Sequence, residues 1–249
     1  MARGYIERGL PISTIVIDWQ HWVAQGDWHF NPVCWPDPQG MVDELKSYGI
    51  ETMVTFWPFQ SKESRYWQEF VSNGYLVNQW NDSTPSSYDG GDQYLCDDTN
   101  PTVRASIFEK FWEGYGQYGI KTVWIDAAEP EHFGAAQEGT WRMSLGTDAE
   151  VGEGWVQAHA KTFAEGFASK GIAPSDYFIL PRSAWAGSWR YSAALWSVSV
   201  HCPPRCQPHS PPPTRVHAQC PQSTPPWALA PSLPFPLHWL QVRRYYFDV

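Results

Sequence analysis

The chain has 249 residues, 43% of them hydrophobic, which is enough for one large α/β domain or two smaller ones with a buried core. Its formal net charge of −9 argues against a nucleic-acid partner, because phosphates require a basic surface. No apolar run reaches the roughly 18 residues of a membrane span, and the start lacks the apolar stretch of a secretory signal. We therefore expect either an intracellular protein or a chain whose true N-terminus is missing.

Aromatic residues make up 16% of the chain and include 16 tryptophans. The flat face of an indole stacks on sugar rings, so an acidic protein rich in tryptophan is a candidate for carbohydrate binding. Indole rings also fill large cores, where the N–H finds a hydrogen-bond partner. Composition alone favours this second, structural interpretation.

The first 196 residues alternate between strands and helices in the manner of a parallel α/β protein. Residues 12–17 are a run of mostly β-branched residues and predict a strand that ends at Asp18. Residues 38–48 predict a helix, since proline stands in the first turn and apolar residues share one face. Residues 51–57 predict the next strand, which Pro58 ends.

The same cycle repeats further along the chain. Asn100 begins a predicted helix that runs through Trp112, and residues 120–125 predict a strand with Asp126 at its end. A further helix is predicted over 155–169 and a further strand over 177–180. These strands are apolar on both faces, as in a parallel sheet covered by helices. No G-x-G-x-x-G loop follows a strand, which argues against nucleotide binding.

The composition changes near Ser197. Of the 22 prolines, 12 lie after His201, and proline disfavours both helices and central strands. We therefore predict a folded α/β domain over residues 1–197 and a disordered, proline-rich tail over residues 198–249. The alternatives for the tail are a PxxP ligand or a Cys/His metal site, but its spacings match no zinc pattern, and we predict no metal.

Polar side chains gather where the predicted strands end. Asp18, Trp57, Asp126, Glu129 and Arg182 all hold such positions. In a (β/α)8 barrel the loops at the carboxyl ends of the strands build the active site. A single aspartate at a strand end is equally explained as a helix cap, but charged residues or tryptophan at four such ends favour an enzyme of the barrel type.

Several short segments rich in tryptophan, aspartate and proline follow the predicted strands. They are Ile-Asp-Trp-Gln-His-Trp at 17–22, Gly-Asp-Trp-His-Phe at 26–30, Trp-Pro-Asp-Pro at 35–38, Phe-Trp-Pro at 56–58, Asp-Thr-Asn-Pro at 98–101 and Trp-Ile-Asp-Ala-Ala-Glu-Pro-Glu at 124–131. Together these segments resemble the catalytic barrel of glycoside hydrolase family 31. The last is closer to the α-xylosidase branch than to the W-x-D-M-N-E of α-glucosidases. The resemblance implies an α/β fold that is a partial (β/α)8 TIM barrel, with about strands 2 to 5 or 6 of eight.

The resemblance also implies a retaining mechanism, in which one carboxylate attacks the anomeric carbon and a second acts as acid and base. It identifies Asp126 as the nucleophile and Glu129 as a supporting carboxylate. The implied substrate-binding residues are Asp18, Trp57, Trp124, Arg182 and Trp196. The substrate would be an α-linked oligosaccharide, a xyloside or a glucoside, and the mechanism uses no cofactor.

The acid/base of the family is absent from the pattern. Family members continue to a Trp-x-Gly-Asp sequence whose aspartate is that residue, whereas this chain has Val198-Ser199 there. A serine hydroxyl is too weak an acid for this step, so we expect a truncated chain that is inactive alone. A non-catalytic carbohydrate-binding remnant and an α-glucan lyase or transglycosylase remain alternatives. The sugar, xylose or glucose, and the oligomeric state stay open.

Overall fold

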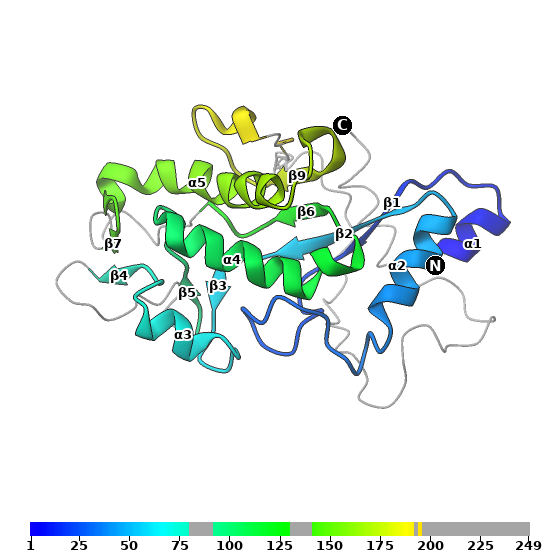
Figure 1. The fold of residues 1–249 in the computed structure, drawn as a ribbon, viewed down its shortest axis with the longest axis horizontal. Coiled ribbons are helices and arrows are strands. Elements are labelled where there is room, and N and C mark those ends of the chain that lie inside the picture. Colours follow the sequence, from blue (N-terminus) through cyan, green and yellow to red (C-terminus); the bar gives the residue numbers. More distant parts are fainter. Residues whose placement is uncertain (80–91, 130–140, 192–193, 196–249) are drawn as a thin grey trace, which may run out of the picture.

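The centre of the fold is a four-stranded parallel sheet (Figure 1). We describe it from a computed structural model in which residues 1–79, 92–129, 141–191 and 194–195 are described. The predicted tail, residues 198–249, lies outside these residues. In spatial order the strands are β1 (Thr14–Ile17), β2 (Glu51–Phe56), β6 (Thr122–Ile125) and β9 (Phe178–Pro181).

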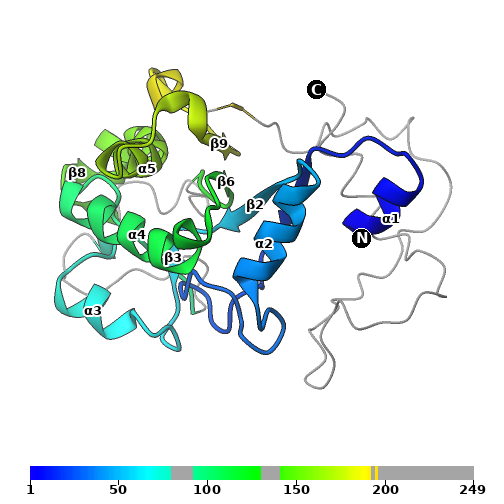
Figure 2. The same cartoon turned by 45° about the vertical axis from the view of Figure 1, so that its right-hand side comes forward.

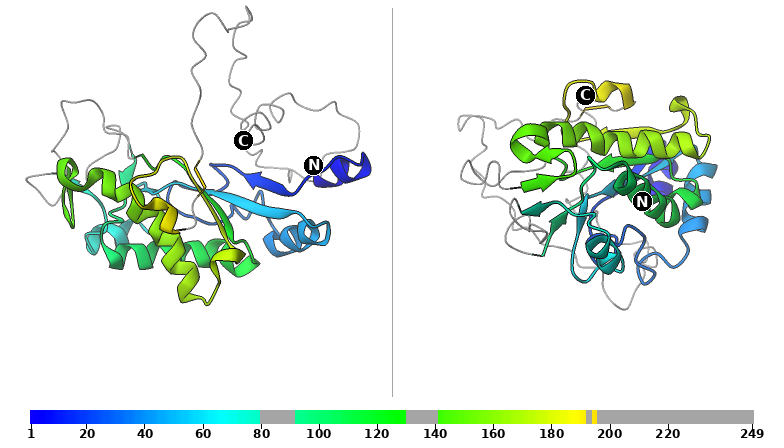
Figure 3. Two further views of the ribbon diagram at one scale, coloured as in Figure 1. Left: turned by 90° about the horizontal axis from the view of Figure 1, so that it is seen from above. Right: turned by 60° about the vertical axis from the view of Figure 1, so that its left-hand side comes forward.

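The strands follow one another across the sheet in the order of the chain, and every pair is parallel. Figure 3 shows α4 (Pro101–Gly114) and α5 (Asp148–Ser169) together on one face of this sheet. A doubly wound sheet would reverse its strand order and carry helices on both faces. A sheet wound in one direction with its helices on one side is a sector of a (β/α) barrel, as predicted.

Side chains at the starts of the helices accept hydrogen bonds from backbone N–H groups that lack a partner within the helix. Asp37 accepts from the backbone of Gly40 at 2.9 Å at the start of α2 (Pro38–Ser47), which lies beside β2 (Figure 2). Asn100 accepts from the backbone of Thr102 at 2.9 Å and begins α4. Each helix has proline at its first position, where the missing donor costs nothing.

The largest core lies between the sheet and these helices. Its strand residues are Val54 and Phe56 from β2, Val123 and Ile125 from β6, and Ile179 from β9. Its helix residues include Val103, Ile107, Phe108 and Phe111 from α4 and Ala160, Phe163 and Phe167 from α5. β1 is only half-buried because it pairs with one strand alone, so the prediction of strands buried on both faces holds best for β2 and β6.

Helix α5 is longer than predicted, since it begins at Asp148 rather than near residue 155. Thr147 and Glu150 form a capping box, in which the threonine hydroxyl accepts from the Glu150 backbone and the glutamate accepts from the Thr147 backbone. Gly152 and Gly154 fall within the first two turns and conceal this helix in the sequence, because glycine is a poor helix former.

Small β elements lie at the carboxyl end of the sheet and were not predicted, because strands of two or three residues carry no period. These strands are β3 (Phe59–Gln60), β4 (Asn78–Gln79), β5 (Tyr94–Leu95), β7 (Trp141–Met143) and β8 (Gly146–Thr147). The remaining elements are two short helices, α1 (Ala2–Glu7) and α3 (Trp67–Ser72), and the 3-10 helices η1 (Gly116–Tyr118), η3 (Pro174–Asp176) and η4 (Ser188–Tyr191). Within the described ranges, no helix has the length and apolar character to cross a membrane.

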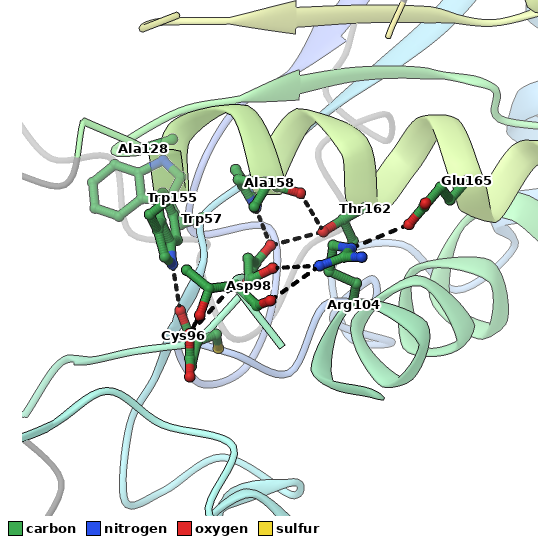
Figure 4. Close-up of polar contacts among 12 residues, drawn as sticks. Trp57, Cys96, Asp98, Arg104, Ala128, Trp155, Ala158, Thr162 and Glu165 are labelled. Carbon is green, nitrogen blue, oxygen red and sulfur yellow. Dashed lines mark hydrogen bonds and ion pairs between the residues drawn. The ribbon is translucent and has the colours of Figure 1, made fainter. Parts of the chain in front are cut away.

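The loop between β5 and α4 is fixed to α5 by buried polar contacts (Figure 4). Asp98 Oδ2 accepts from Thr162 Oγ1 at 2.9 Å and lies 2.6 Å from His159 Nδ1. Trp155 Nε1 donates to the Cys96 carbonyl at 2.9 Å, while Arg104 donates to the Asp98 carbonyl at 3.0 Å. Since buried polar groups are costly without partners, these contacts hold the loop in a single position.

Candidate active site

The strand register brings the predicted site residues to one edge of the sheet. Ile17 pairs with Val54, Phe56 pairs with Ile125, and Ile125 pairs with Pro181. By this register Trp57, Asp126 and Arg182 lie at one level, and Asp18 lies beside Thr55, two residues before Trp57. Side chains alternate along a strand. The side chains of Val123 and Ile125 pack in the core beneath the helices. Trp124 and Asp126 alternate with them along the chain and therefore face the opposite side of the sheet, which is the interior of a barrel.

Asp126 is the centre of this group. Its side chain is almost buried and its backbone N–H donates to the Phe56 carbonyl at 3.0 Å, which continues the ladder between β2 and β6. Arg182 NH1 lies 3.2 Å from Asp126 Oδ1, in an ion pair. Ala127 has a φ of 50°, a left-handed conformation that residues other than glycine seldom adopt. Such strain persists where the surroundings enforce it, often at functional sites.

Burial raises the pKa of Asp126 from 3.8 to about 6. The guanidinium of Arg182 and the N–H of Ala127 act in the opposite direction, and the nearby carboxylates of Asp18 and Glu129 add to the rise. A carboxyl group whose pKa is this high and which lies beside a fixed cation is typical of catalytic sites.

Glu129 holds Arg182 from the other side. Arg182 NH2 donates to Glu129 Oε2 at 2.6 Å, and Arg182 Nε donates to the second oxygen of the same carboxylate. This two-pronged geometry orients a planar guanidinium better than a single bond would. Ser183 Oγ donates to the Ala128 carbonyl at 2.7 Å and fixes the segment between Asp126 and Glu129. Glu129 thus contacts the arginine and leaves Asp126 as the carboxylate that faces the site.

Asp18 lies at the end of the neighbouring strand, β1. Its Oδ1 accepts from the Trp19 backbone N–H at 2.7 Å and from Thr55 Oγ1 at 3.2 Å. Burial raises the pKa of Asp18, while these two hydrogen bonds lower it. Thr55 was not among the predicted site residues. Its signal was available, since Thr55 precedes Trp57 by two residues on one strand and so faces the same side.

The tryptophans contribute a flat aromatic surface. The rings of Trp19 and Trp57 are stacked with centroids 4.9 Å apart and planes 3° from parallel. Trp57 Nε1 is buried and has no hydrogen-bond partner among the described residues. Trp124 lies buried two residues before Asp126. Trp196, the remaining predicted residue, lies outside the described residues. Trp19 was not predicted as a site residue, because its stacking partner Trp57 is 38 positions away in the sequence and no local pattern links the two.

Within the part of the chain that the structure describes, no group of three His, Cys, Asp or Glu side chains is placed to hold a metal ion. The described side chains that meet at this edge carry carboxylates, a guanidinium and indole rings.

Comparisons with known proteins agree with this geometry. The family model of the TIM-barrel domain of glycosyl hydrolases family 31 matches residues 1–201. A protein of Pseudescherichia vulneris named uncharacterized family 31 glucosidase ORF2 is 37% identical over 201 residues, which are 81% of this chain and 37% of that protein. α-Xylosidase A of Aspergillus niger is 30% identical over 218 residues, covering 79% of this chain and 30% of its own length.

Solved structures show the same likeness. A GH31 α-xylosidase from a soil metagenome, complexed with xylose, superposes with a TM-score of 0.73 at 39% identity and covers 78% of this chain and 28% of its own. A xylosidase from Aspergillus niger gives a TM-score of 0.70 at 27% identity. The chain spans only about a third of the length of these relatives. The family model matches most of the chain, and the fold is a sector of the same barrel. The chain therefore belongs to glycoside hydrolase family 31.

Proposed function

We propose that the chain carries the nucleophile side of the active site of a retaining α-glycosidase, with Asp126 as the nucleophile. The ion pair between Arg182 and Asp126 supports this most directly, because it fixes a nearly buried carboxylate at the carboxyl edge of a barrel sheet. Glu129 holds the arginine by both oxygens, so the two carboxylates have different tasks.

The proposed substrates carry a terminal α-xylosyl or α-glucosyl unit. Relatives with this barrel are named as α-xylosidases and as a family 31 glucosidase. In the proposed complex the sugar lies against Trp57 and Trp124, and Asp18 accepts hydrogen bonds from its hydroxyl groups. The stacked indole of Trp19 supports the apolar wall, since a flat aromatic face suits the C–H face of a pyranose.

The first chemical step forms a bond between an Asp126 oxygen and the anomeric carbon as the bond to the leaving oxygen breaks. That leaving oxygen needs a proton from an acid, and the hydrolysis of the intermediate needs a base. By resemblance, Ser199 stands where the family has this second carboxyl group, and it lies outside the described residues. We therefore propose that this chain by itself does not turn over ordinary glycosides.

A substrate that needs no acid separates the two halves of this proposal. α-Xylosyl fluoride and α-glucosyl fluoride lose fluoride without protonation, so Asp126 can still displace it. Because water attack on the intermediate lacks a base, the glycosyl–Asp126 ester should accumulate. Mass spectrometry of the intact chain should then show one added sugar, and digestion should place it on the peptide that contains Asp126. The control is Asp126→Asn, which should show no adduct.

Two results would contradict the proposal in different ways. Hydrolysis of an aryl α-xyloside above a buffer blank would show that the chain possesses an acid/base after all. An adduct on another residue, or none with either fluoride, would refute Asp126 as the nucleophile of this chain.

A second candidate function is carbohydrate binding without catalysis, and the Trp19–Trp57 stack favours it. Isothermal titration with xylose, glucose and their oligomers would detect such binding. Heat of binding that persists in Asp126→Asn, without any adduct from the fluorides, would favour this function over the catalytic one.

A further inference from the structure

A buried hydrogen-bonded pair lies directly behind Asp18. His21 follows Asp18 by three residues, and Tyr115 comes from the C-terminal cap of α4. His21 Nδ1 lies 2.7 Å from the Asp18 carbonyl oxygen, and His21 Nε2 lies 2.6 Å from Tyr115 Oη. Both side chains have essentially no exposure to solvent, so neither can contact a sugar.

The direction of these bonds follows from the chemistry of the partners. A carbonyl oxygen can only accept, so His21 Nδ1 carries the hydrogen and donates to Asp18. In the neutral ring Nε2 then has a lone pair, and the Tyr115 hydroxyl donates to it. The order of donation is Tyr115 to His21 to the Asp18 backbone, which fixes one tautomer of the imidazole.

The surroundings keep this imidazole neutral. Trp22, Phe30 and Trp35 pack their rings around His21, with centroids between 4.6 and 6.1 Å away. The pKa of His21 is lowered to about 4, mainly by burial; the bond to the Asp18 carbonyl acts in the opposite direction, and the nearby His29 acts in the same direction as burial. Tyr115 is also titratable, but burial raises its pKa well above 10. The neutral pair therefore persists across the physiological range.

The turn that this pair holds is strained. Gln20, between Asp18 and His21, has a φ of 65°, so its backbone is left-handed without being glycine. A second bond closes the far side of the loop, where the Asn31 N–H donates to the His21 carbonyl at 2.8 Å. Without the imidazole the turn from Asp18 to His21 would lose the contact that opposes its strain.

We propose that His21, held by Tyr115, is a positioning residue that sets the place of the Asp18 carboxylate. This inference rests on the proposed role of Asp18 in sugar binding. His21 and Tyr115 do not contact the sugar themselves. They hold the turn, and the turn places the Asp18 carboxylate beside Thr55 and at the edge of the site.

The test uses matched substitutions in the full chain. His21→Phe fills the space but donates nothing, while His21→Asn places an amide N–H where Nδ1 was. Tyr115→Phe keeps the ring and removes only the hydroxyl, so it keeps the proposal testable should His21→Phe fail to fold. Thr162→Val is the control, because it removes a buried hydroxyl from the Asp98 contact and not from this turn.

The readout is the backbone N–H of Trp19, which donates to Asp18 Oδ1 and so reports the ionisation of that carboxyl group by NMR. In the unchanged chain this resonance should titrate above the ordinary pKa of aspartate. In His21→Phe the midpoint should rise, because Asp18 is already exposed and a loosened turn removes the Trp19 and Thr55 hydrogen bonds that lower its pKa. His21→Asn should reverse most of this rise, Tyr115→Phe should lie between, and Thr162→Val should match the unchanged chain.

Xylose affinity gives the second measurement. We expect a loss of about tenfold in His21→Phe and a substantial recovery in His21→Asn, as for one positioning hydrogen bond. If the unchanged chain does not bind xylose, the proposed function is at fault, and the Trp19 titration still decides the positioning role. Identical titration midpoints in all variants, or an asparagine variant as altered as the phenylalanine one, would overturn it.

Discussion

At the scale of single residues, Asp126 shows how a site can weaken the fold that carries it. Its pKa is 3.8 in an ordinary setting and about 6 in the folded chain. Between these values the folded state binds more protons than the unfolded state, so the free energy of unfolding falls as the pH rises through this window. Above about pH 6 the fold bears the whole cost of a buried carboxylate.

Asp126→Asn should therefore stabilise the chain at neutral pH. We expect a gain of the order of 1 to 3 kcal/mol in the free energy of unfolding at pH 7.5, and almost none near pH 4. Urea unfolding at the two pH values measures this difference. Asp43→Asn, an exposed position on α2, is the control and should change little at either pH. An equal gain at both pH values would contradict this explanation.

The same ionisation should govern reaction with the glycosyl fluorides. Only the charged form of Asp126 is a nucleophile, so the rate of adduct formation should rise with pH and level off above about 6. The rate of adduct appearance is measured by mass spectrometry between about pH 4 and pH 8, roughly two units to either side of this pKa. A rate that falls over this range would mean that the titrating group acts as an acid.

At the scale of elements, helix α5 depends on a cap that lies far from its buried residues. The hydroxyl of Thr147 satisfies a backbone donor at the first turn, and Glu150 returns the bond. Thr147→Ala should lower the free energy of unfolding by about 1 kcal/mol. Thermal unfolding measures the loss, and Glu153→Ala, an exposed change in the same helix, is the control. Equal effects of the two changes would show that the cap contributes nothing specific.

The elements also show what a sequence can predict. The β-branched run before Asp18 and the apolar run before Asp126 predicted β1 and β6, since a buried parallel strand is a short apolar run between breakers. The start of α5 was missed because two glycines interrupt the pattern, and β3, β4, β5, β7 and β8 were missed because their pairing is set by distant chain segments. The predicted rim positions of Asp18, Asp126 and Arg182 agree with the structure, whereas the His21–Tyr115 contact joins residues 94 positions apart and leaves no local pattern.

At the scale of the whole molecule, the parallel sheet has strands of unequal protection. Among the described residues, β2 and β6 each pair on both sides, while β1 and β9 each pair on one. β2 and β6 each contribute two fully buried residues to the core, Val54 and Phe56 from β2 and Val123 and Ile125 from β6. We expect hydrogen exchange to be slowest in residues 51–56 and 122–125 and faster in residues 14–17, because opening an edge strand breaks fewer contacts. Mass spectrometry of deuterated peptides measures this order, and uniform exchange across the four strands would contradict the described sheet.

The arrangement around Arg182 has a consequence for the electric field at this edge of the sheet. Two carboxyl groups, those of Asp126 and Glu129, contact one guanidinium, and a third, that of Asp18, lies close enough to Asp126 to raise its pKa. When all three are ionised the local charge is negative, and the burial of Asp126 limits the screening of its charge by water. In the proposed reaction the sugar passes through an oxocarbenium-like state with positive charge at its anomeric carbon. The surplus of negative charge would lower the energy of that short-lived cation relative to the neutral glycoside, so the cluster that weakens the fold is also suited to speed bond cleavage.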